Sequence, residues 1–373
     1  MKRTDRLGRL SVLLGVLALL LVSGCVPAAL PPPTPTPVLV PAPRGPYLQS
    51  VTPTSVWVVW DIVERTVGRV SYGETADLGQ EIVEDQAARH HAVELTGLQP
   101  YTVYHYRVDD GQTYTFRTAP TAEQDTFRFA VLGDTRTNQE PHAAVVAQVV
   151  DAAPDLVIHT GDLVGDGWDA AQWDTFFRIE APLLRTAPFY PAMGNHEKND
   201  PLYFEAFHLP GNERWYAFDY GPARFIILEI DRYAEYGPGS DQMMWLEEEL
   251  TATDASWVFV AFHIAVYTSR SEEFDEVALR NTLTPLFETY GVDLAFQGHH
   301  HSYERIPVDG VTYIVTAGGG APLYAMEEPE PNSAALASAH HFVLLEVEGD
   351  TLTGTAIDRN GTVIDSFELT QDE

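Results

Sequence analysis

Five apolar runs in the second part of the chain are each followed directly by a polar turn, and this repeat constrains the fold most strongly. The runs span residues 127–132, 156–160, 189–193, 257–262 and 292–296. Helical patterns separate them, at residues 141–152, 170–184, 242–250 and 275–290. Short apolar runs that alternate with helices are typical of strands buried on both faces. The sequence therefore predicts an α/β domain whose central sheets are flanked by helices, as an αββα sandwich.

The turns after these runs carry side chains that can bind metal ions. They supply Asp134, Asp162, Asn195, His263, His299 and His301. A lone Gly-Asp is more often an ordinary turn than a ligand, but five such turns in order are hard to explain that way. Since ligands bind at the carboxyl ends of strands in α/β sheets, these side chains are expected to meet at one edge. Oxygen and imidazole ligands without thiolate suit Fe, Mn or Zn.

The stretch from residue 46 to 118 has a different pattern, which consists of strands without helices. Strand patterns occur at 56–60, 68–72, 91–95, 101–109 and 113–117, with turn residues between them. Several short strands at this spacing predict an all-β sandwich of the fibronectin type III kind. No group of potential catalytic residues lies in this stretch. Its expected role is to act as a spacer and to form a wall beside the catalytic domain.

The N-terminus reads as an export signal. Basic residues precede an apolar segment, Leu10 to Val22, that is too short to span a bilayer comfortably. The sequence Val22-Ser23-Gly24-Cys25 follows, and Cys25 is the only cysteine of the chain. This resembles a bacterial lipobox, which implies that Cys25 is lipidated and anchors an exported protein to a membrane. The alternative is an uncleaved signal-anchor helix with an incidental cysteine.

A Pro-rich stretch from Pro27 to Pro46 follows the cysteine. Such a run stays extended as polyproline II at ~3.1 Å per residue, so about twenty residues reach roughly 60 Å. The expected division of the chain is a signal peptide at 1–25, a tether at 26–45, a β-sandwich at 46–120 and the α/β domain at 121–373.

The charge of the chain excludes some partners. The 373 residues include 22 basic and 54 acidic ones, for a formal net charge of -32. A field this negative repels nucleic acid and anionic membrane surfaces. We therefore expect no nucleic-acid partner, and no obligate protein partner is evident.

Several short sequence motifs of the chain resemble those of one enzyme family. The C-terminal ones are Gly298-His299-His300-His301-Ser302-Tyr303-Glu304-Arg305 and Ala317-Gly318-Gly319-Gly320-Ala321-Pro322-Leu323-Tyr324. The N-terminal ones are Gly45-Pro46-Tyr47-Leu48-Gln49, Leu95-Thr96-Gly97-Leu98-Gln99-Pro100 and Phe116-Arg117-Thr118-Ala119-Pro120. With the polar turns, they resemble the calcineurin-like metallophosphoesterase superfamily, and within it a bacterial relative of purple acid phosphatases.

The resemblance implies a role for each residue of the site. It implies that Asp134 and His301 bind a first metal ion and that Asp162 bridges to a second. The second ion would also be bound by Asn195, His263 and His299. His196 would not bind metal but would lie near the substrate, as the general acid or as a group that stabilises phosphoryl charge.

The implied activity is hydrolysis of a small phosphorylated substrate outside the cytoplasm. Two metal ions about 3.5–4 Å apart can clamp the attacking and leaving oxygens, and metal-bound hydroxide serves as nucleophile. A phosphomonoesterase of the acid phosphatase kind is expected. The alternatives are a phosphodiesterase or nucleotide hydrolase at the same site, and a catalytically weak surface-binding lipoprotein.

Two positions depart from the family pattern. Most of the superfamily has a histidine ligand where this chain has Arg136, and purple acid phosphatases have a tyrosine ligand where this chain has Gly165. The first metal position therefore keeps Asp134, Asp162 and His301 as recognisable ligands. Arg136 has two possible roles, as a donor to the substrate phosphate or as the partner of a nearby carboxylate.

Overall fold

The computed structural model describes residues 43–270, 276–325 and 328–371. The predicted signal peptide with Cys25, and the tether up to residue 42, lie outside the described residues. Within the described part of the chain, no helix combines the length and the apolar character needed to cross a membrane.

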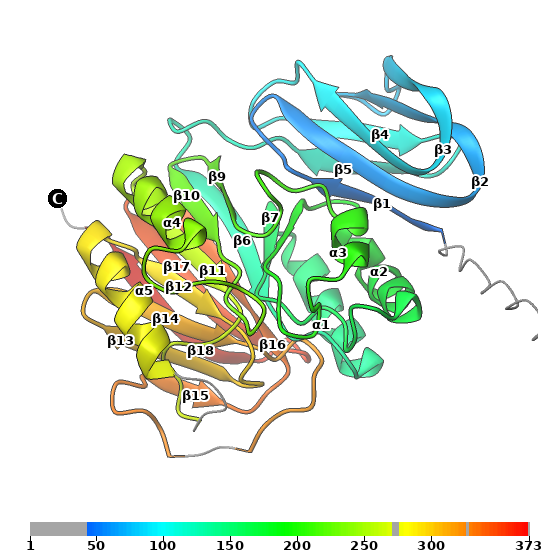
Figure 1. The fold of residues 1–373 in the computed structure, drawn as a ribbon. Coiled ribbons are helices and arrows are strands. Elements are labelled where there is room, and N and C mark those ends of the chain that lie inside the picture. The colour runs from blue at the N-terminus through cyan, green and yellow to red at the C-terminus, as the bar shows by residue number, and fades with distance from the viewer. Residues whose placement is uncertain (1–42, 271–275, 326–327, 372–373) are drawn as a thin grey trace, which may run out of the picture. The chain divides into compact units, whose positions relative to one another are not determined.

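The N-terminal part is an all-β unit, as predicted. Its strands are β1 (Arg44–Gln49), β2 (Ser55–Gly73), β3 (Gln80–Thr96), β4 (Val103–Val108) and β5 (Thr113–Arg117). The order is β1-β2-β4-β5, and β3 pairs with β2. Figure 1 shows β2 and β3 as two long, bent ribbons.

The prediction of separate strands at 56–60 and 68–72 is wrong, because both belong to β2. The residues between them include β-branched ones and neither glycine nor proline, so nothing breaks the extended backbone. The pairing of β2 with β3 instead shifts its register between Asp61 and Thr66. The strand predicted from His91 likewise begins at Gln80.

The rest of the chain forms two mixed sheets with helices on their outer faces, as predicted (Figure 1). The six-stranded sheet, in the order β18-β17-β16-β6-β7-β8, contains β6 (Thr126–Leu132), β7 (Leu156–His159), β8 (Phe189–Pro191), β16 (His341–Glu348), β17 (Thr351–Asp358) and β18 (Val363–Thr370). The seven-stranded sheet, in the order β15-β13-β14-β12-β11-β10-β9, contains β9 (Tyr216–Tyr220), β10 (Ala223–Ile227), β11 (Trp257–Phe262), β12 (Leu294–Gln297), β13 (Tyr303–Val308), β14 (Val311–Thr316) and β15 (Ala335–Ala337). The helices are α1 (Gln139–Ala152), α2 (Ala170–Leu184), α3 (Pro201–Ala206), α4 (Asp241–Ala252) and α5 (Glu276–Tyr290).

Aromatic side chains hold the two sheets together. The ring of Phe129 on β6 lies 5.1 Å from the ring centroids of Phe225 and Phe259 and 6.0 Å from that of Phe296, all on the seven-stranded sheet. Each such pair contributes about 0.5–1.5 kcal/mol beyond the burial of its area. A second cluster, which includes Leu246 and Leu283, packs α4 and α5 against the outer face of the seven-stranded sheet.

One short helix lies outside the predicted helical segments. This helix, α3, occupies the six residues Pro201–Ala206. The side chain of Asp200 caps this helix by accepting the Leu202 N–H at 2.7 Å, and Pro201 stands at its first position. Both are common helix-start signals, so this element was readable from the sequence.

Candidate metal centre

The six residues predicted as ligands come together where strands of both sheets end. β6, β7 and β8 pair in parallel, and the loops after them carry Asp134, Asp162 and Asn195. β11 and β12 of the other sheet also pair in parallel, and the chain after them carries His263, His299 and His301. Because the carboxyl ends of parallel strands meet at one edge, five separate turns converge.

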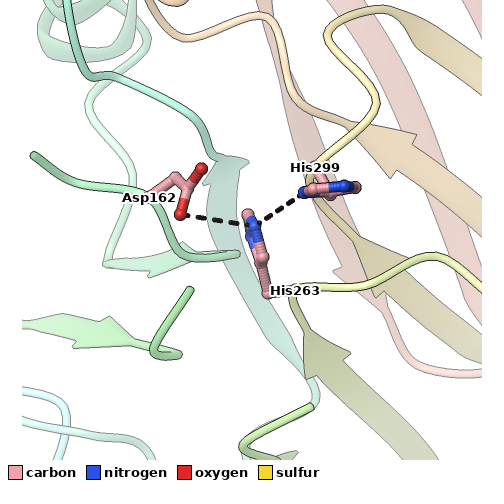
Figure 2. A group of neighbouring side chains, drawn as sticks. All are labelled: Asp162, His263 and His299. Atoms are coloured by element: carbon pink, nitrogen blue, oxygen red, sulfur yellow. Dashed lines mark hydrogen bonds and ion pairs between the residues drawn. The ribbon is translucent and has the colours of Figure 1, made fainter. Parts of the chain in front are cut away.

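One cluster has the geometry of a metal site. Nε2 of His263 lies 3.1 Å from Oδ1 of Asn195, 3.4 Å from Oδ1 of Asp162 and 3.3 Å from Nδ1 of His299. The ligand atoms of Asp162, His263 and His299 all lie within 4.8 Å of one another, as Figure 2 shows. Nδ1 of His263 contacts the carbonyl of Thr160 at 2.9 Å and donates its proton there, so Nε2 presents a lone pair. These four atoms can all act as acceptors. A single proton can satisfy one of the contacts between them, whereas one metal cation can bind all four atoms. These residues therefore fit the second metal position.

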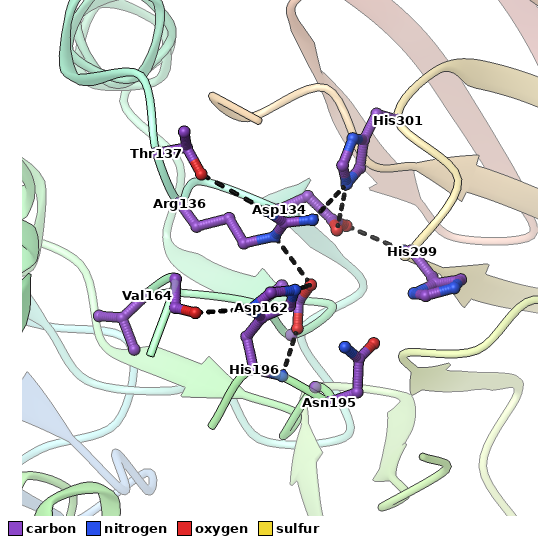
Figure 3. A network of polar contacts seen from close by, with 12 residues as sticks. Asp134, Arg136, Thr137, Asp162, Val164, Asn195, His196, His299 and His301 are labelled. Atoms are coloured by element: carbon purple, nitrogen blue, oxygen red, sulfur yellow. Dashed lines mark hydrogen bonds and ion pairs between the residues drawn. The ribbon is translucent and has the colours of Figure 1, made fainter. Parts of the chain in front are cut away.

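The other predicted position is arranged differently. Nε2 of His301 lies 3.3 Å from Oδ1 of Asp134, and Nδ1 of His301 donates to the carbonyl of Pro322 at 2.7 Å. Arg136 lies between this pair and Asp162 (Figure 3). Its Nε donates to Oδ2 of Asp162 at 3.0 Å, and its Nη2 is 3.2 Å from Nε2 of His301. Arg136 thus forms an ion pair with a carboxylate, which is one of its two expected roles.

Unusual backbone conformations position several ligands. Asp134, Asp162 and His299 have φ values of 56°, 57° and 68°, in the left-handed region that residues with side chains rarely occupy. Gly161, with φ of 96°, precedes the bridging aspartate, and a Cβ atom there would lie 2.8 Å from Nδ1 of His263. Strained backbone of this kind persists where the surrounding structure over-determines it, which is common at functional sites.

Glu197 ties two ligand loops together. It is fully buried, and its carboxylate accepts the N–H groups of Gly194 at 2.7 Å, Asp162 at 2.9 Å and Val164 at 3.2 Å. Burial, together with the nearby Asp162 carboxylate, raises the pKa of Glu197. These contacts make Glu197 a supporting residue of the metal centre.

Replacing Glu197 with glutamine is expected to weaken metal binding roughly 10–100-fold, the usual effect of losing an outer partner of the ligands. The amide would turn an NH₂ group toward backbone N–H groups that need an acceptor. Titration calorimetry with Mn²⁺ measures the change, and the exposed Glu140→Gln is the matched control. Unchanged affinity in Glu197→Gln would show that the loops hold their positions without this carboxylate.

His196 lies at the exposed side of the centre. Its Nδ1 donates to the carbonyl of Gly165 at 2.6 Å, and its Nε2 is 3.8 Å from Oδ2 of Asp162. The side chain is 29% exposed, whereas that of Asp162 is fully buried. Because Nδ1 is engaged, Nε2 is the atom that can carry a proton toward a bound substrate.

The charges of the centre favour an ionised Asp162 and a neutral His299. Burial alone would raise the pKa of Asp162, but His263, His196 and Arg136 together lower it below its usual value. Burial, with a smaller effect of His263, lowers the pKa of His299 far below that of a free imidazole. A neutral imidazole beside a carboxylate is the form that binds metal ions.

Some positioning groups had no sequence signal. The carbonyls of Thr160 and Pro322 orient His263 and His301, but a backbone carbonyl leaves no mark in the residue pattern. His159 is a buried, hydrogen-bonded residue that contacts Oγ1 of Thr135 at 3.1 Å and the N–H of Gly161 at 3.1 Å.

Comparison with known proteins points to one family. Residues 127–303 match the family model described as calcineurin-like phosphoesterase. Purple acid phosphatase 15 of Arabidopsis thaliana is 27% identical over 286 residues, which cover 62% of this chain and 53% of that protein. The probable inactive purple acid phosphatase 1 of the same plant is 26% identical over 363 residues, covering 76% of this chain and 58% of that protein.

A solved structure supports the same fold. The purple acid phosphatase PPD1 from yellow lupin (Lupinus luteus) seeds matches with a TM-score of 0.76 at 23% sequence identity, covering 89% of this chain and 75% of that one. The present chain spans little more than half the length of the two Arabidopsis relatives. The chain is therefore similar in sequence to calcineurin-like phosphoesterases and purple acid phosphatases, and it shares its fold with the lupin protein.

Proposed function

We propose that the protein is an exported phosphoric ester hydrolase that cleaves small phosphomonoesters, in the manner of an acid phosphatase. The observation that carries this proposal is the convergence of His263, Asn195, Asp162 and His299 on one point, with His196 at the exposed side. The negative charge of the chain supports a small substrate over a long polyanion.

The residues of the centre divide the chemistry between them. Metal ions of the Fe, Mn or Zn type, when bound, supply Lewis acidity and lower the pKa of bound water. Asp162 turns Oδ1 toward His263 and Oδ2 toward Arg136, so its carboxylate joins the two halves of the site. His196 holds a proton on Nε2 and gives it to the leaving oxygen, which a poor leaving group needs. In this proposal the N-terminal all-β unit is a fibronectin III-like spacer and takes no part in the chemistry.

A paired assay tests the proposal. The full-length protein, loaded in turn with Mn, Zn and Fe, is given p-nitrophenyl phosphate and bis-p-nitrophenyl phosphate. We expect turnover of both substrates, with the higher kcat/KM for the monoester. A higher value for the diester would replace the monoesterase proposal with a phosphodiesterase.

A second candidate is a metal-binding surface protein without turnover. The contacts of Arg136 with Asp162 and His301 favour it, because they occupy donor atoms that the family uses for metal. The name of the probable inactive Arabidopsis relative agrees with such a loss. Metal binding without hydrolysis of either ester, under all three metals, would select this candidate.

The proposed location depends on Cys25. We expect Cys25→Ser to move the protein from the membrane fraction to the soluble extracytoplasmic fraction, because a lipid chain on this residue would be the anchor. Cell fractionation with immunoblotting measures the change, and Ser23→Ala serves as a neighbouring control. Persistent membrane attachment of the Cys25→Ser protein would favour an uncleaved N-terminal helix.

A further inference from the structure

The donor atoms of the first metal position are already engaged by a cation of the chain. Arg136 directs Nε at Oδ2 of Asp162 and Nη2 at Nε2 of His301. Since Nδ1 of His301 donates to the Pro322 carbonyl, its Nε2 carries the lone pair and accepts the guanidinium N–H. A metal ion bound by Asp162 and His301 would need these same two atoms.

The guanidinium is held in this place from several directions. The backbone N–H of Arg136 donates to the Asp162 carbonyl at 3.3 Å, and Nη1 donates to Oγ1 of Thr137 at 3.4 Å. The Arg136 side chain is 17% exposed, and its carboxylate partner is fully buried. A metal ion at this position would therefore have to displace the guanidinium from its buried carboxylate partner.

The net charge of the centre also disfavours a second metal ion. Asp134 and Asp162 contribute two negative charges, and Arg136 contributes one positive charge that no accessible pH removes. One divalent ion brings this group to a net charge of plus one. A second divalent ion would raise it to plus three in a largely buried space, with like charges close together.

The ligand count also separates the two positions. In the parts of the chain that the structure describes, the His and Asp groups that converge closely enough for a metal ion are Asp162, His263 and His299, at the second position. The first position has Arg136 and Gly165 at both places where the family supplies a further ligand. Oδ1 of Asp134 is buried, accepts no hydrogen bond and lies 3.3 Å from Nε2 of His301.

We propose that the protein binds one metal ion per chain, at Asp162, Asn195, His263 and His299, and that the Arg136 guanidinium takes the place of the first metal ion. The inference rests on the proposed function only in treating this cluster as a metal centre. In a hydrolytic cycle the guanidinium would supply the fixed positive charge that a second metal ion supplies in a dinuclear site.

Metal stoichiometry tests this proposal without reference to activity. The full-length protein is saturated with Mn²⁺ and desalted, and bound metal is measured by elemental analysis. We expect one equivalent in the wild type and in the exposed control Arg178→His, and two equivalents in Arg136→His, which restores the histidine common in the family. Electron paramagnetic resonance should show an isolated Mn²⁺ ion in the wild type and an exchange-coupled pair in Arg136→His.

Further variants show which of the two positions holds the bound metal ion. Asp134→Asn should keep one equivalent, because its carboxylate belongs to the position that Arg136 fills, whereas His263→Ala should bind none. If Arg136→His is not folded, as judged by thermal melting, Arg136→Met removes the charge and is expected to gain metal instead. Two equivalents and a coupled spectrum in the wild type would overturn the inference.

The two proposals fail in different ways. A wild type that binds two metal ions and hydrolyses phosphate esters would refute the single-ion inference and leave the proposed function standing. A wild type that binds one metal ion and hydrolyses none of the esters would refute the proposed function and support the inference.

Discussion

Changing Asp162 to asparagine is expected to lower kcat/KM for p-nitrophenyl phosphate by about a thousandfold, the upper range for removing one preorganised electrostatic contact. Both oxygens of this buried carboxylate are in use, Oδ1 toward His263 and Oδ2 toward Arg136. An amide keeps the shape but loses the charge, and its NH₂ group would face either Nε2 of His263 or the guanidinium. We therefore expect loss of bound metal together with loss of turnover.

The measurement pairs steady-state kinetics with metal analysis of the same sample. Asp219→Asn is the matched control, because its carboxylate forms a surface ion pair with Arg224 and its side chain is 71% exposed. That variant should keep the wild-type rate, since exposed pairs contribute ~1 kcal/mol or less to stability. Equal rates for Asp162→Asn and the wild type would rule out hydrolysis at this centre.

Replacing His196 with glutamine is expected to lower kcat roughly 10²–10⁴-fold for substrates with poor leaving groups, the usual contribution of a positioned acid. Nε2 of His196 is the atom that would deliver the proton, since Nδ1 donates to the Gly165 carbonyl. A p-nitrophenolate leaves without protonation, so the loss should be much smaller for p-nitrophenyl phosphate than for an alkyl phosphate. Metal content should stay at the wild-type value.

The dependence on the leaving group separates acid catalysis from a structural role. Rates for a series of aryl and alkyl phosphates, plotted against leaving-group pKa, should show a steeper slope for His196→Gln than for the wild type. His90→Gln, in the N-terminal all-β unit, changes an exposed histidine that pairs with Asp61 and should keep the wild-type slope. An equal loss for all substrates would instead assign His196 to charge stabilisation or to positioning.

The strand-and-turn pattern predicted the α/β architecture because each signal was local. A buried strand such as 257–262 ends where a polar residue follows, and His263 is therefore visible without knowledge of the tertiary fold. Parallel pairing then determines which strand ends meet, so the grouping of residues far apart in the chain followed from a general rule. The coarser family resemblance was confirmed by the match at residues 127–303.

What the sequence left open depends on contacts between distant segments. The contacts of Arg136 with Asp162 and His301 join residues far apart in the chain, and the residue pattern does not show them. Two predicted strands form the single strand β2, which pairs with β3 across a register shift. Residue propensities do not encode this pairing. The three backbone partners of the Glu197 carboxylate come from two loops, and the residue pattern does not bring these loops together.

The left-handed backbone at Asp134, Asp162 and His299 bears on whether the chain folds before it binds metal. Contacts within the folded chain, among them the hydrogen bond from the Asp162 N–H to Glu197, hold these conformations. We therefore expect folding and metal loading to be separable steps, unlike in zinc fingers, where the metal creates the fold.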